Sequence, residues 1–292
     1  MLPQDVILPP RLGSARADES DVVRVRWLGT AGFSIDHRGC VVLIDPYVTR
    51  APRGRCVTGS LRSDAGLVAR HAPAADAIIA GHTHFDHVLD VPAIARATGA
   101  RVFGSRSAAA LCRMEGVDPA QVTVVERDAG EPDAEAEVGP FRLRFVPSAH
   151  SRFLLGRVPF PGEISDCDQV PLRVSHYRCG AVFGVELSVA GRRIYHVGSA
   201  DLVEAARPPS GVDLVLCCTA GWTATPRFAE RLVRALSPGA IVLSHWDDFF
   251  SPLDAPVRAL PAIRLPRLVE ALSAAAPSIL VGTLPLLGEV SL

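Results

Sequence analysis

Apolar and polar residues follow two strand patterns along this chain. In residues 22–28 and 141–146 they alternate, which is typical of strands with one buried face. In residues 41–44, 77–80 and 240–244 the apolar residues form short uninterrupted runs, which are typical of fully buried strands. Both patterns occur in each half of the chain.

Helices are expected after the strands of each half. Their expected positions are residues 91–98, 108–115, 226–236 and 266–275. Pro226 lies near the first turn of the third helix, and Pro238-Gly239 ends it. Two strand-rich halves that are each followed by helices indicate two sheets packed together with helices outside. The predicted fold class is therefore mixed α/β (α+β).

The second buried run leads into the densest group of chemically active side chains. Gly81 lets the chain leave the strand sharply, and His82, His84, Asp86 and His87 follow. His82 and His84 alternate and can point the same way, while the following turn brings Asp86 and His87 to a neighbouring point. Imidazole and carboxylate ligands without a thiolate suit zinc, at two adjacent metal positions. The alternative is a polar surface loop that is rich in histidine.

The segment His82-Thr83-His84-Phe85-Asp86-His87 resembles the His-x-His-x-Asp-His signature of the metallo-β-lactamase superfamily of metal-dependent hydrolases. The resemblance covers about residues 22–285. Trp27-Leu28-Gly29 and Ser244-His245-Trp246-Asp247-Asp248 make it most similar to the branch with ascorbate-6-phosphate lactonase and N-acyl-phosphatidylethanolamine phospholipase. It implies a four-layer αββα sandwich whose two halves surround one metal site.

The resemblance also implies further site residues at the ends of other strands. His150 follows an alternating strand and is the expected third ligand of the first metal, and His245 follows a buried strand and is the expected ligand of the second. Otherwise each is an exposed loop histidine. Asp45, after the first buried run, resembles the aspartate that orients the ligand loop through hydrogen bonds. Otherwise it is a turn residue before Pro46.

One position departs from the family pattern. Many members carry an aspartate that bridges the two metals, but Ser199 stands at that place here and Asp201 lies two residues later. A serine hydroxyl stays protonated near neutral pH and is a poor zinc ligand. Either Asp201 turns in, because positions two apart on an extended segment face the same way, or the bridge has no side chain. We expect a weak second site, and one or two zinc ions per chain.

The composition limits the classes of partner. Thirty arginines and no lysine balance 31 acidic residues, and this near-neutral charge argues against a broad nucleic-acid-binding face. A local basic patch at Arg50, Arg53 and Arg55 has the simpler alternative of a solvated loop. No uninterrupted apolar run approaches the roughly 20 residues of a spanning helix, so no transmembrane segment is expected. Nothing in the sequence indicates an oligomeric state.

The cysteines and the amino terminus favour a cytoplasmic protein. Seven scattered cysteines without a CxxC pair do not indicate a disulfide framework. No basic start followed by an apolar stretch marks a signal peptide. Residues 1–20 are polar and contain prolines, so we expect an arm there. Residues 21–292 are expected to form a single domain built from two halves.

The segment after His150 gives the best indication of substrate. Residues 151–175 are long, partly apolar and broken by Pro and Gly, which predicts either a lid over the metal site or a loop that packs on the core. His176 and Tyr177 are candidate donors to a developing oxyanion, with an ordinary half-buried strand pair as the alternative. Trp246, Phe249 and Phe250 would add an apolar wall next to His245.

These observations predict a metal-dependent hydrolase that acts on a small, partly apolar organic substrate. Bound zinc lowers the pKa of water to about 7, so a zinc-activated hydroxide would cleave an ester, lactone, amide or phosphodiester bond. Asp86 would hold the second metal and orient the hydroxide. The alternative is a non-catalytic member of the fold that binds a ligand or partner, which Ser199 favours. A diiron oxidoreductase would favour a carboxylate where His84 stands.

Overall fold

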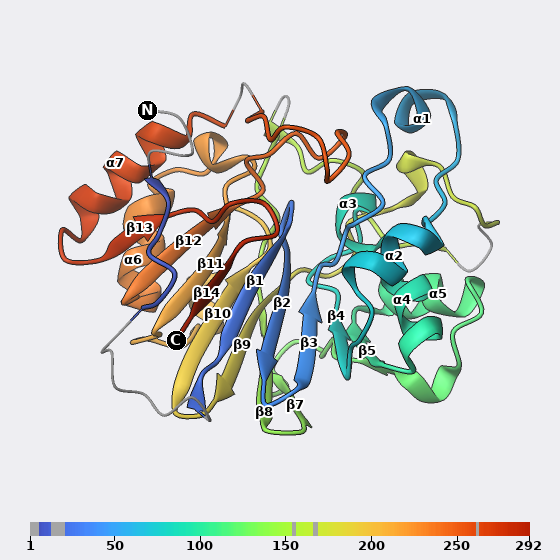
Figure 1. Ribbon diagram of the computed structural model, residues 1–292, viewed down its shortest axis with the longest axis horizontal. Coiled ribbons are helices and arrows are strands. Elements are labelled where there is room, and N and C mark those ends of the chain that lie inside the picture. The colour runs from blue at the N-terminus through green and yellow to red at the C-terminus, as the bar shows by residue number, and fades with distance from the viewer. Residues whose placement is uncertain (1–5, 13–20, 154–155, 166–168, 261–262) are drawn as a thin grey trace.

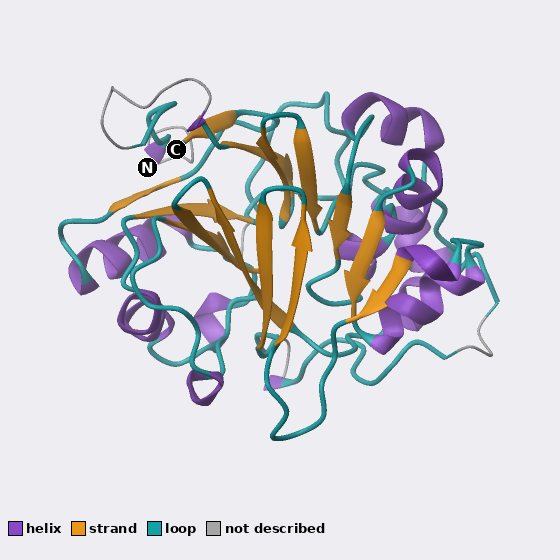
Figure 2. Ribbon diagram, turned by 90° about the horizontal axis from the view of Figure 1, so that it is seen from below, coloured by secondary structure: helices purple, strands orange, loops and turns teal. Residues whose placement is uncertain are grey.

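The computed structural model describes residues 6–12, 21–153, 156–165, 169–260 and 263–292. Two seven-stranded sheets lie in the middle of the molecule and helices cover both outer sides, as Figure 2 shows. The helices α2, α4 and α5 lie beside one sheet and α6 and α7 beside the other (Figure 1). The mixed α/β fold with two packed sheets and outer helices, which the sequence predicts, is confirmed.

The first sheet has the strand order β14-β1-β2-β3-β4-β5-β6. Its strands are β1 (Arg24–Gly29), β2 (Gly32–His37), β3 (Cys40–Ile44), β4 (Ala77–Ile79), β5 (Arg101–Gly104), β6 (Val122–Val124) and β14 (Glu289–Ser291). The pairs from β14 to β3 are antiparallel, and those from β3 to β6 are parallel. The parallel strands β3 and β4 therefore end at the same edge of the sheet.

The second sheet repeats this arrangement with the order β13-β12-β11-β10-β9-β8-β7. Its strands are β7 (Ala134–Val138), β8 (Phe141–Pro147), β9 (Phe183–Val189), β10 (Arg192–Val197), β11 (Leu214–Cys218), β12 (Ala240–Ser244) and β13 (Leu280–Gly282). The pairs from β7 to β10 are antiparallel, and those from β10 to β13 are parallel.

The helices belong mostly to the connections between parallel strands. Their bounds are α1 (Arg53–Thr58), α2 (Ala65–His71), α3 (Phe85–Val88), α4 (Val91–Thr98), α5 (Arg106–Met114), α6 (Phe228–Leu236) and α7 (Leu265–Ala275). Short 3₁₀ turns occur at η3 (Pro119–Gln121), η5 (Val174–His176), η6 (Glu204–Ala206) and η7 (Trp222–Ala224). In the described part of the chain, no helix is both long and apolar enough to cross a membrane.

Successive residues of the central strands enter two different cores. Ile79 of β4 and Phe103 of β5 join the larger core, which also contains Phe145 of β8. Their neighbours Ile78 and Val102 join the second core with residues of α4 and α5. Because side chains alternate along a strand, one face of the first sheet packs on the other sheet and one on helices. This explains the uninterrupted apolar runs in the sequence.

Part of the expected N-terminal arm lies against the carboxyl-terminal strands. Leu8 N donates to Thr283 O at 2.9 Å, Leu12 N donates to Ser291 O at 2.8 Å, and both leucine side chains are buried in the larger core. Residues 1–5 and 13–20 of the arm lie outside the described residues.

Candidate metal centre

The two sheets bring the ends of several strands to one place. Asp45 follows β3 directly and His245 follows β12 directly. His82 follows β4 after a two-residue link, and His150 follows β8 after a similar link. Asp86 and His87 lie in the single turn of α3, which begins immediately after His84. Residues that are distant in sequence therefore surround one point at the shared edge of the sheets.

The six candidate ligands form two groups of three, and a third group of Asp45, His82 and His87 overlaps both. The ligand atoms of His82, His84 and His150 lie within 4.8 Å of one another, and so do those of Asp86, His87 and His245. The rings of His82 and His87, one from each group, have centroids 3.8 Å apart. The structure thus brings together all six residues for which the sequence predicts metal ligation, as two adjacent three-residue groups.

Hydrogen bonds define which nitrogen of three imidazoles is free. His84 Nε2 lies 2.8 Å from Pro159 O, and His150 Nδ1 lies 2.7 Å from Ser151 O. A carbonyl oxygen only accepts, so these nitrogens carry the protons, and His84 Nδ1 and His150 Nε2 have free lone pairs. His87 Nδ1 is held by Asp45 Oδ2 at 2.8 Å, which leaves Nε2. Such partners fix the tautomer of metal-binding histidines.

The other two histidines have unsatisfied nitrogens. His82 Nδ1 and His245 Nδ1 are buried without a hydrogen-bond partner. His82 Nε2 lies 3.1 Å from His84 Nδ1, and His245 Nε2 lies 3.1 Å from Asp86 Oδ2. Buried polar atoms without partners are costly, and two imidazole nitrogens that face each other are a natural place for a cation. The donor set therefore fits a metal ion.

The electrostatics keep four of the candidate ligands in their metal-binding forms. Burial and the neighbouring imidazoles lower the pKa of His82 far below its ordinary value, and burial, chiefly, lowers the pKa of His150 to about 3. Burial also lowers the pKa of His84. Burial opposes ionisation of Asp86, but His245 and His87 outweigh it and the pKa of this carboxyl falls. His82, His84 and His150 are therefore neutral and Asp86 is ionised near pH 7.

Asp45 connects the end of β3 to the loop after β4, which carries the candidate ligands His82 to His87. Its Oδ1 accepts from Gly81 N at 2.6 Å while its Oδ2 binds His87. Burial lowers the pKa of His87, but the Asp45 carboxylate outweighs burial and the net shift is upward. A Cβ at Gly81 or Gly198 would lie 3.1 or 3.0 Å from Asp45 Oδ2, so glycine leaves room for the carboxylate. Asp45 thus holds both the Gly81 amide and the His87 ring, and its role in orienting the loop stays a prediction.

The side chains of Ser199 and Asp201 are bound to residues outside the set of candidate metal ligands. Ser199 Oγ accepts from Ser151 N at 2.9 Å and donates to Ser151 Oγ at 3.3 Å. Asp201 Oδ1 instead accepts from Arg231 Nη1 at 3.0 Å and from Leu202 N at 2.8 Å. The structure does not turn Asp201 toward the histidines, because the Arg231 guanidinium already binds its carboxylate.

His176 and Tyr177 are not strand residues, unlike the alternative considered from the sequence. His176 ends the 3₁₀ turn η5 and is partly exposed. Tyr177 is buried in the second core, and burial together with Glu115 and Asp90 raises the pKa of its hydroxyl. Those carboxylates belong to the helical side of the first sheet. The oxyanion role of His176 and Tyr177 stays a prediction.

The segment after His150 covers part of the site. Pro159 O contacts His84, while Phe160 O and Gly162 O accept from Cys179 N and Gly180 N at 2.9 Å each. Its phenylalanines Phe153 and Phe160 are 54% and 40% exposed. Residues 154–155 and 166–168 of the expected lid lie outside the described residues. On the other side, the ring of Phe249 lies 5.1 Å from that of His245.

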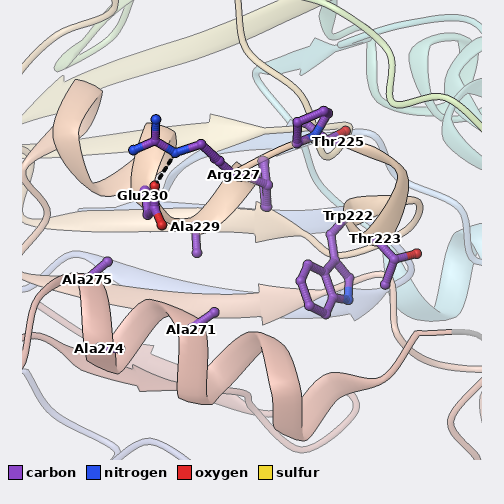
Figure 3. A pocket seen from close by; sticks show the side chains of 11 residues that line it. Trp222, Thr223, Thr225, Arg227, Ala229, Glu230, Ala271, Ala274 and Ala275 are labelled. Atoms are coloured by element: carbon purple, nitrogen blue, oxygen red, sulfur yellow. Dashed lines mark hydrogen bonds and ion pairs between the residues drawn. The ribbon is translucent and has the colours of Figure 1, made fainter.

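Two cavities have similar sizes but different surroundings. One of about 460 Å³ lies between the start of α6 and α7, where Trp222 and the small side chains of Ala271 and Ala275 line it (Figure 3). Its Arg227 pairs with Glu230. The other, of about 470 Å³, is lined by His150 and by Val158, Pro161 and Gly162. These three residues belong to the segment that covers part of the site, called the covering segment below. Only the second cavity borders the candidate metal centre.

Sequence reasoning missed a buried ion pair next to the site. Arg50, expected in a local patch or a solvated loop, is buried and binds Asp247, which lies two residues after His245. The guanidinium packs against Gly29, where a Cβ would lie 1.7 Å from Arg50 Nη2. The sequence does show an aspartate, Asp247, close to the predicted ligand His245. Its partner Arg50, however, is 197 positions away in the chain.

Comparisons with known proteins agree with this geometry. Residues 24–245 match the family model described as a beta-lactamase superfamily domain. A UPF0173 metal-dependent hydrolase of Myxococcus xanthus is 28% identical over 77% of this chain and 71% of that protein. One of Methylocella silvestris is 35% identical, over 27% of this chain and only 30% of its own length.

Solved structures support the same fold. The metallo-beta-lactamase fold protein YhfI of Bacillus subtilis matches with a TM-score of 0.56 and 13% identity, over 93% of this chain and 99% of that one. The superfamily resemblance drawn from the sequence is thereby confirmed, whereas the narrower branch stays a prediction. The chain belongs to the family described as a beta-lactamase superfamily domain, and it has the metallo-β-lactamase fold.

Proposed function

We propose that this protein is a zinc-dependent hydrolase, with residues 21–292 acting as a single catalytic domain. The observation that carries the proposal is the pair of ligand groups whose imidazoles have their free nitrogens defined by hydrogen bonds. Relatives that match most of the chain are named metal-dependent hydrolases. Nitrogen and carboxylate donors without thiolate suit zinc.

The two ligand groups would bind zinc with different affinities. His82, His84 and His150 would form the tighter site, because all three imidazoles are neutral near pH 7. Asp86, His87 and His245 would form a weaker site, since neither Ser199 nor Asp201 adds a carboxylate there. A bound zinc ion supplies Lewis acidity and lowers the pKa of water.

The residues of the chain would prepare the reaction around that ion. Asp86 stays ionised and is held by His245, so it can accept a hydrogen bond from a nucleophilic water. Asp45 fixes the His87 ring and the Gly81 amide. The segment that carries Pro159 covers His84 and limits the access of bulk water.

We propose a small organic substrate with an apolar part and an ester, lactone, amide or phosphodiester bond. The cavity of about 470 Å³ next to His150 is large enough for a small molecule and has apolar walls.

We place the protein in the cytoplasm, because the six described cysteines are free.

A second candidate function is ligand binding without catalysis. Ser199 favours it, because its hydroxyl is bound to Ser151 and supplies no charge to the second group. The complete set of six candidate ligands favours the hydrolase.

Metal content tests the proposal. We would measure zinc per chain in protein purified without added metal, next to His82→Ala, Asp86→Ala and the control His71→Ala, which alters a histidine of α2 outside the cluster. Hydrolysis of 4-nitrophenyl hexanoate and bis(4-nitrophenyl) phosphate would be measured in parallel. We expect one to two zinc ions and measurable turnover, both lowered by the first two changes. Metal without turnover of either ester supports the binding protein, and absence of metal, even after zinc is added, contradicts the hydrolase and favours the binding protein.

A further inference from the structure

The cavity next to His150 is part of the metal centre. His150 belongs to the first ligand group and also lines the cavity. Pro159 O binds His84, the neighbour of His150 in that group, while Val158 and Pro161 on either side of it form another wall. A molecule in this cavity therefore lies between the candidate metal ligands and the covering segment.

Two oppositely charged side chains line the cavity, but one of them is already paired. Glu126, after β6, accepts from Arg106 Nη1 at 2.6 Å and from Arg106 N at 3.0 Å. Asp128 also pairs with Arg106, at 3.5 Å. The guanidinium at the start of α5 therefore neutralises the acids on both sides of Arg127.

Arg127 itself has no such partner. Its one hydrogen bond is from Nη1 to the backbone oxygen of Glu126 at 3.4 Å, and it forms no ion pair with any residue that the structure describes. It is exposed, and it lines the cavity. The cavity is thus lined by a cation without an ion-pair partner among the described residues, by one candidate metal ligand, His150, and by the apolar side chains of Val158 and Phe183.

We propose that the cavity selects a substrate that carries an oxyanion, and that Arg127 binds this group. The inference rests on the proposed hydrolase function. The guanidinium fork matches the two oxygens of a carboxylate or phosphate. The apolar part of the substrate lies along Val158 and Phe183, and its scissile bond lies at the ligand group of His150. The substrate class is therefore an anionic ester or lactone.

A matched pair of esters tests this assignment. The zinc-loaded protein is assayed with 4-nitrophenyl hexanoate, which is neutral, and with the 4-nitrophenyl monoester of adipic acid, which places a carboxylate at the end of a chain of similar length. The variants are Arg127→Ala, Arg127→Lys and the control Arg142→Ala. Arg142 is an equally exposed arginine at the other end of β8, where it pairs with Glu137 at 3.5 Å.

We expect kcat/KM for the adipate ester to exceed that for hexanoate about tenfold, as for one charge-assisted hydrogen bond. Arg127→Ala should remove this preference by raising KM for the adipate ester, and Arg127→Lys should restore part of it. Arg142→Ala should behave as the unaltered protein. Equal rates for both esters, unaffected by Arg127→Ala, would overturn the assignment and leave the hydrolase function standing.

Binding decides the matter if neither ester is hydrolysed, which would count against the hydrolase itself. Titration calorimetry with adipate and with hexyl phosphate gives the affinity without turnover. A dissociation constant that rises about tenfold in Arg127→Ala supports the oxyanion site, and the tighter of the two ligands identifies a carboxylate or a phosphate. Equal affinities in the unaltered protein and Arg127→Ala would overturn it.

Discussion

Arg50 and Asp247 form an ion pair of 2.6 Å in which both side chains are almost completely buried. Both oxygens of Asp247 also accept from Thr30 N, at 3.0 and 3.2 Å. Thr30 O in turn accepts from His245 N at 2.7 Å. The pair therefore joins the loop after β3, the turn after β1 and the backbone of a candidate metal ligand. Arg50, Thr30 and His245 all have positive φ angles, so contacts beyond their own loops hold this geometry.

Removing the carboxylate should be strongly destabilising. Asp247→Asn leaves the buried Arg50 charge without its partner, and breaking a buried pair in this way costs about 3–5 kcal/mol. Asp248→Asn is the matched control, because Asp248 pairs with Arg53, which is 64% exposed, and such a pair contributes about 0–1 kcal/mol. Urea unfolding at pH 7.5 measures both. Similar losses in the two variants would show that the Arg50 contact is not special.

Gly29 should tolerate no side chain. In Gly29→Ala the Cβ would lie 1.7 Å from Arg50 Nη2, and the residue has φ of +89°. Gly39→Ala is the control, since Gly39 has φ of +79° and open space around it. Both changes carry a left-handed backbone cost of about 1–2 kcal/mol, and Gly29→Ala adds about 1–3 kcal/mol for overpacking. Equal unfolding free energies of the two variants would contradict the close contact.

Asp45→Asn should weaken metal binding more than it weakens the fold. The amide removes the charge that holds His87 Nδ1, and loss of such a partner lowers metal affinity roughly 10- to 100-fold. Competition with a chromophoric chelator gives the zinc affinity. Asp36→Asn, which removes a more exposed carboxylate 3.7 Å from Arg24, should leave it unchanged. Unaltered affinity in Asp45→Asn would show that the contact does not support the ligand.

The metal-free protein should lose stability as the pH falls below neutrality. Burial lowers the pKa of His82, His84 and His150, so these groups bind protons in the unfolded chain before they do in the folded one. Their contribution is complete above about pH 6.5, the unfolded value, and is lost between that pH and about 3 for His150. The raised pKa of His87 acts in the opposite direction. We expect the net change to follow the three histidines whose pKa is lowered.

Urea midpoints at pH 7.5 and 5.5 measure this dependence in the chelator-treated protein. His150→Gln should reduce the difference between the two midpoints. His176→Gln, which alters a partly exposed histidine outside the cluster, should leave the difference unchanged. A midpoint that rises on acidification would contradict the assignment of neutral, buried imidazoles.

The local sequence was sufficient to place a candidate site residue where that residue closely follows a strand. The apolar runs before Asp45, His82 and His245 predict strands that the structure contains, and each site residue follows its strand. Helix α1 could not be predicted in this way, because none of its residues is buried and it has no apolar face to detect. The burial of Tyr177 could not be foreseen from its own segment, because its ring packs in a core whose other members come from distant segments.

Contacts between distant loops were beyond sequence reasoning for a different reason. The partner of His84 is a backbone carbonyl 75 positions away, and any residue type supplies a carbonyl. The partner of Asp247 is an arginine in a chain with thirty of them. Residue type therefore gave no means of choosing the partner, whereas three imidazoles close together in sequence indicated the candidate metal centre.

The segment over the site should affect substrate binding more than metal binding. Replacing residues 157–161 with a five-residue Gly-Ser linker removes the wall formed by Val158 and Pro161 and frees the backbone around Pro159. Flexible backbone must be ordered when the substrate binds, so KM for 4-nitrophenyl hexanoate should rise about tenfold. Zinc per chain should stay the same, since no side chain of residues 157–161 is among the candidate ligands. The same replacement at residues 274–278, a mostly exposed stretch at the end of α7, is the control. An unchanged KM would show that the segment only packs on the core, and a loss of zinc would show that it supports the ligands directly.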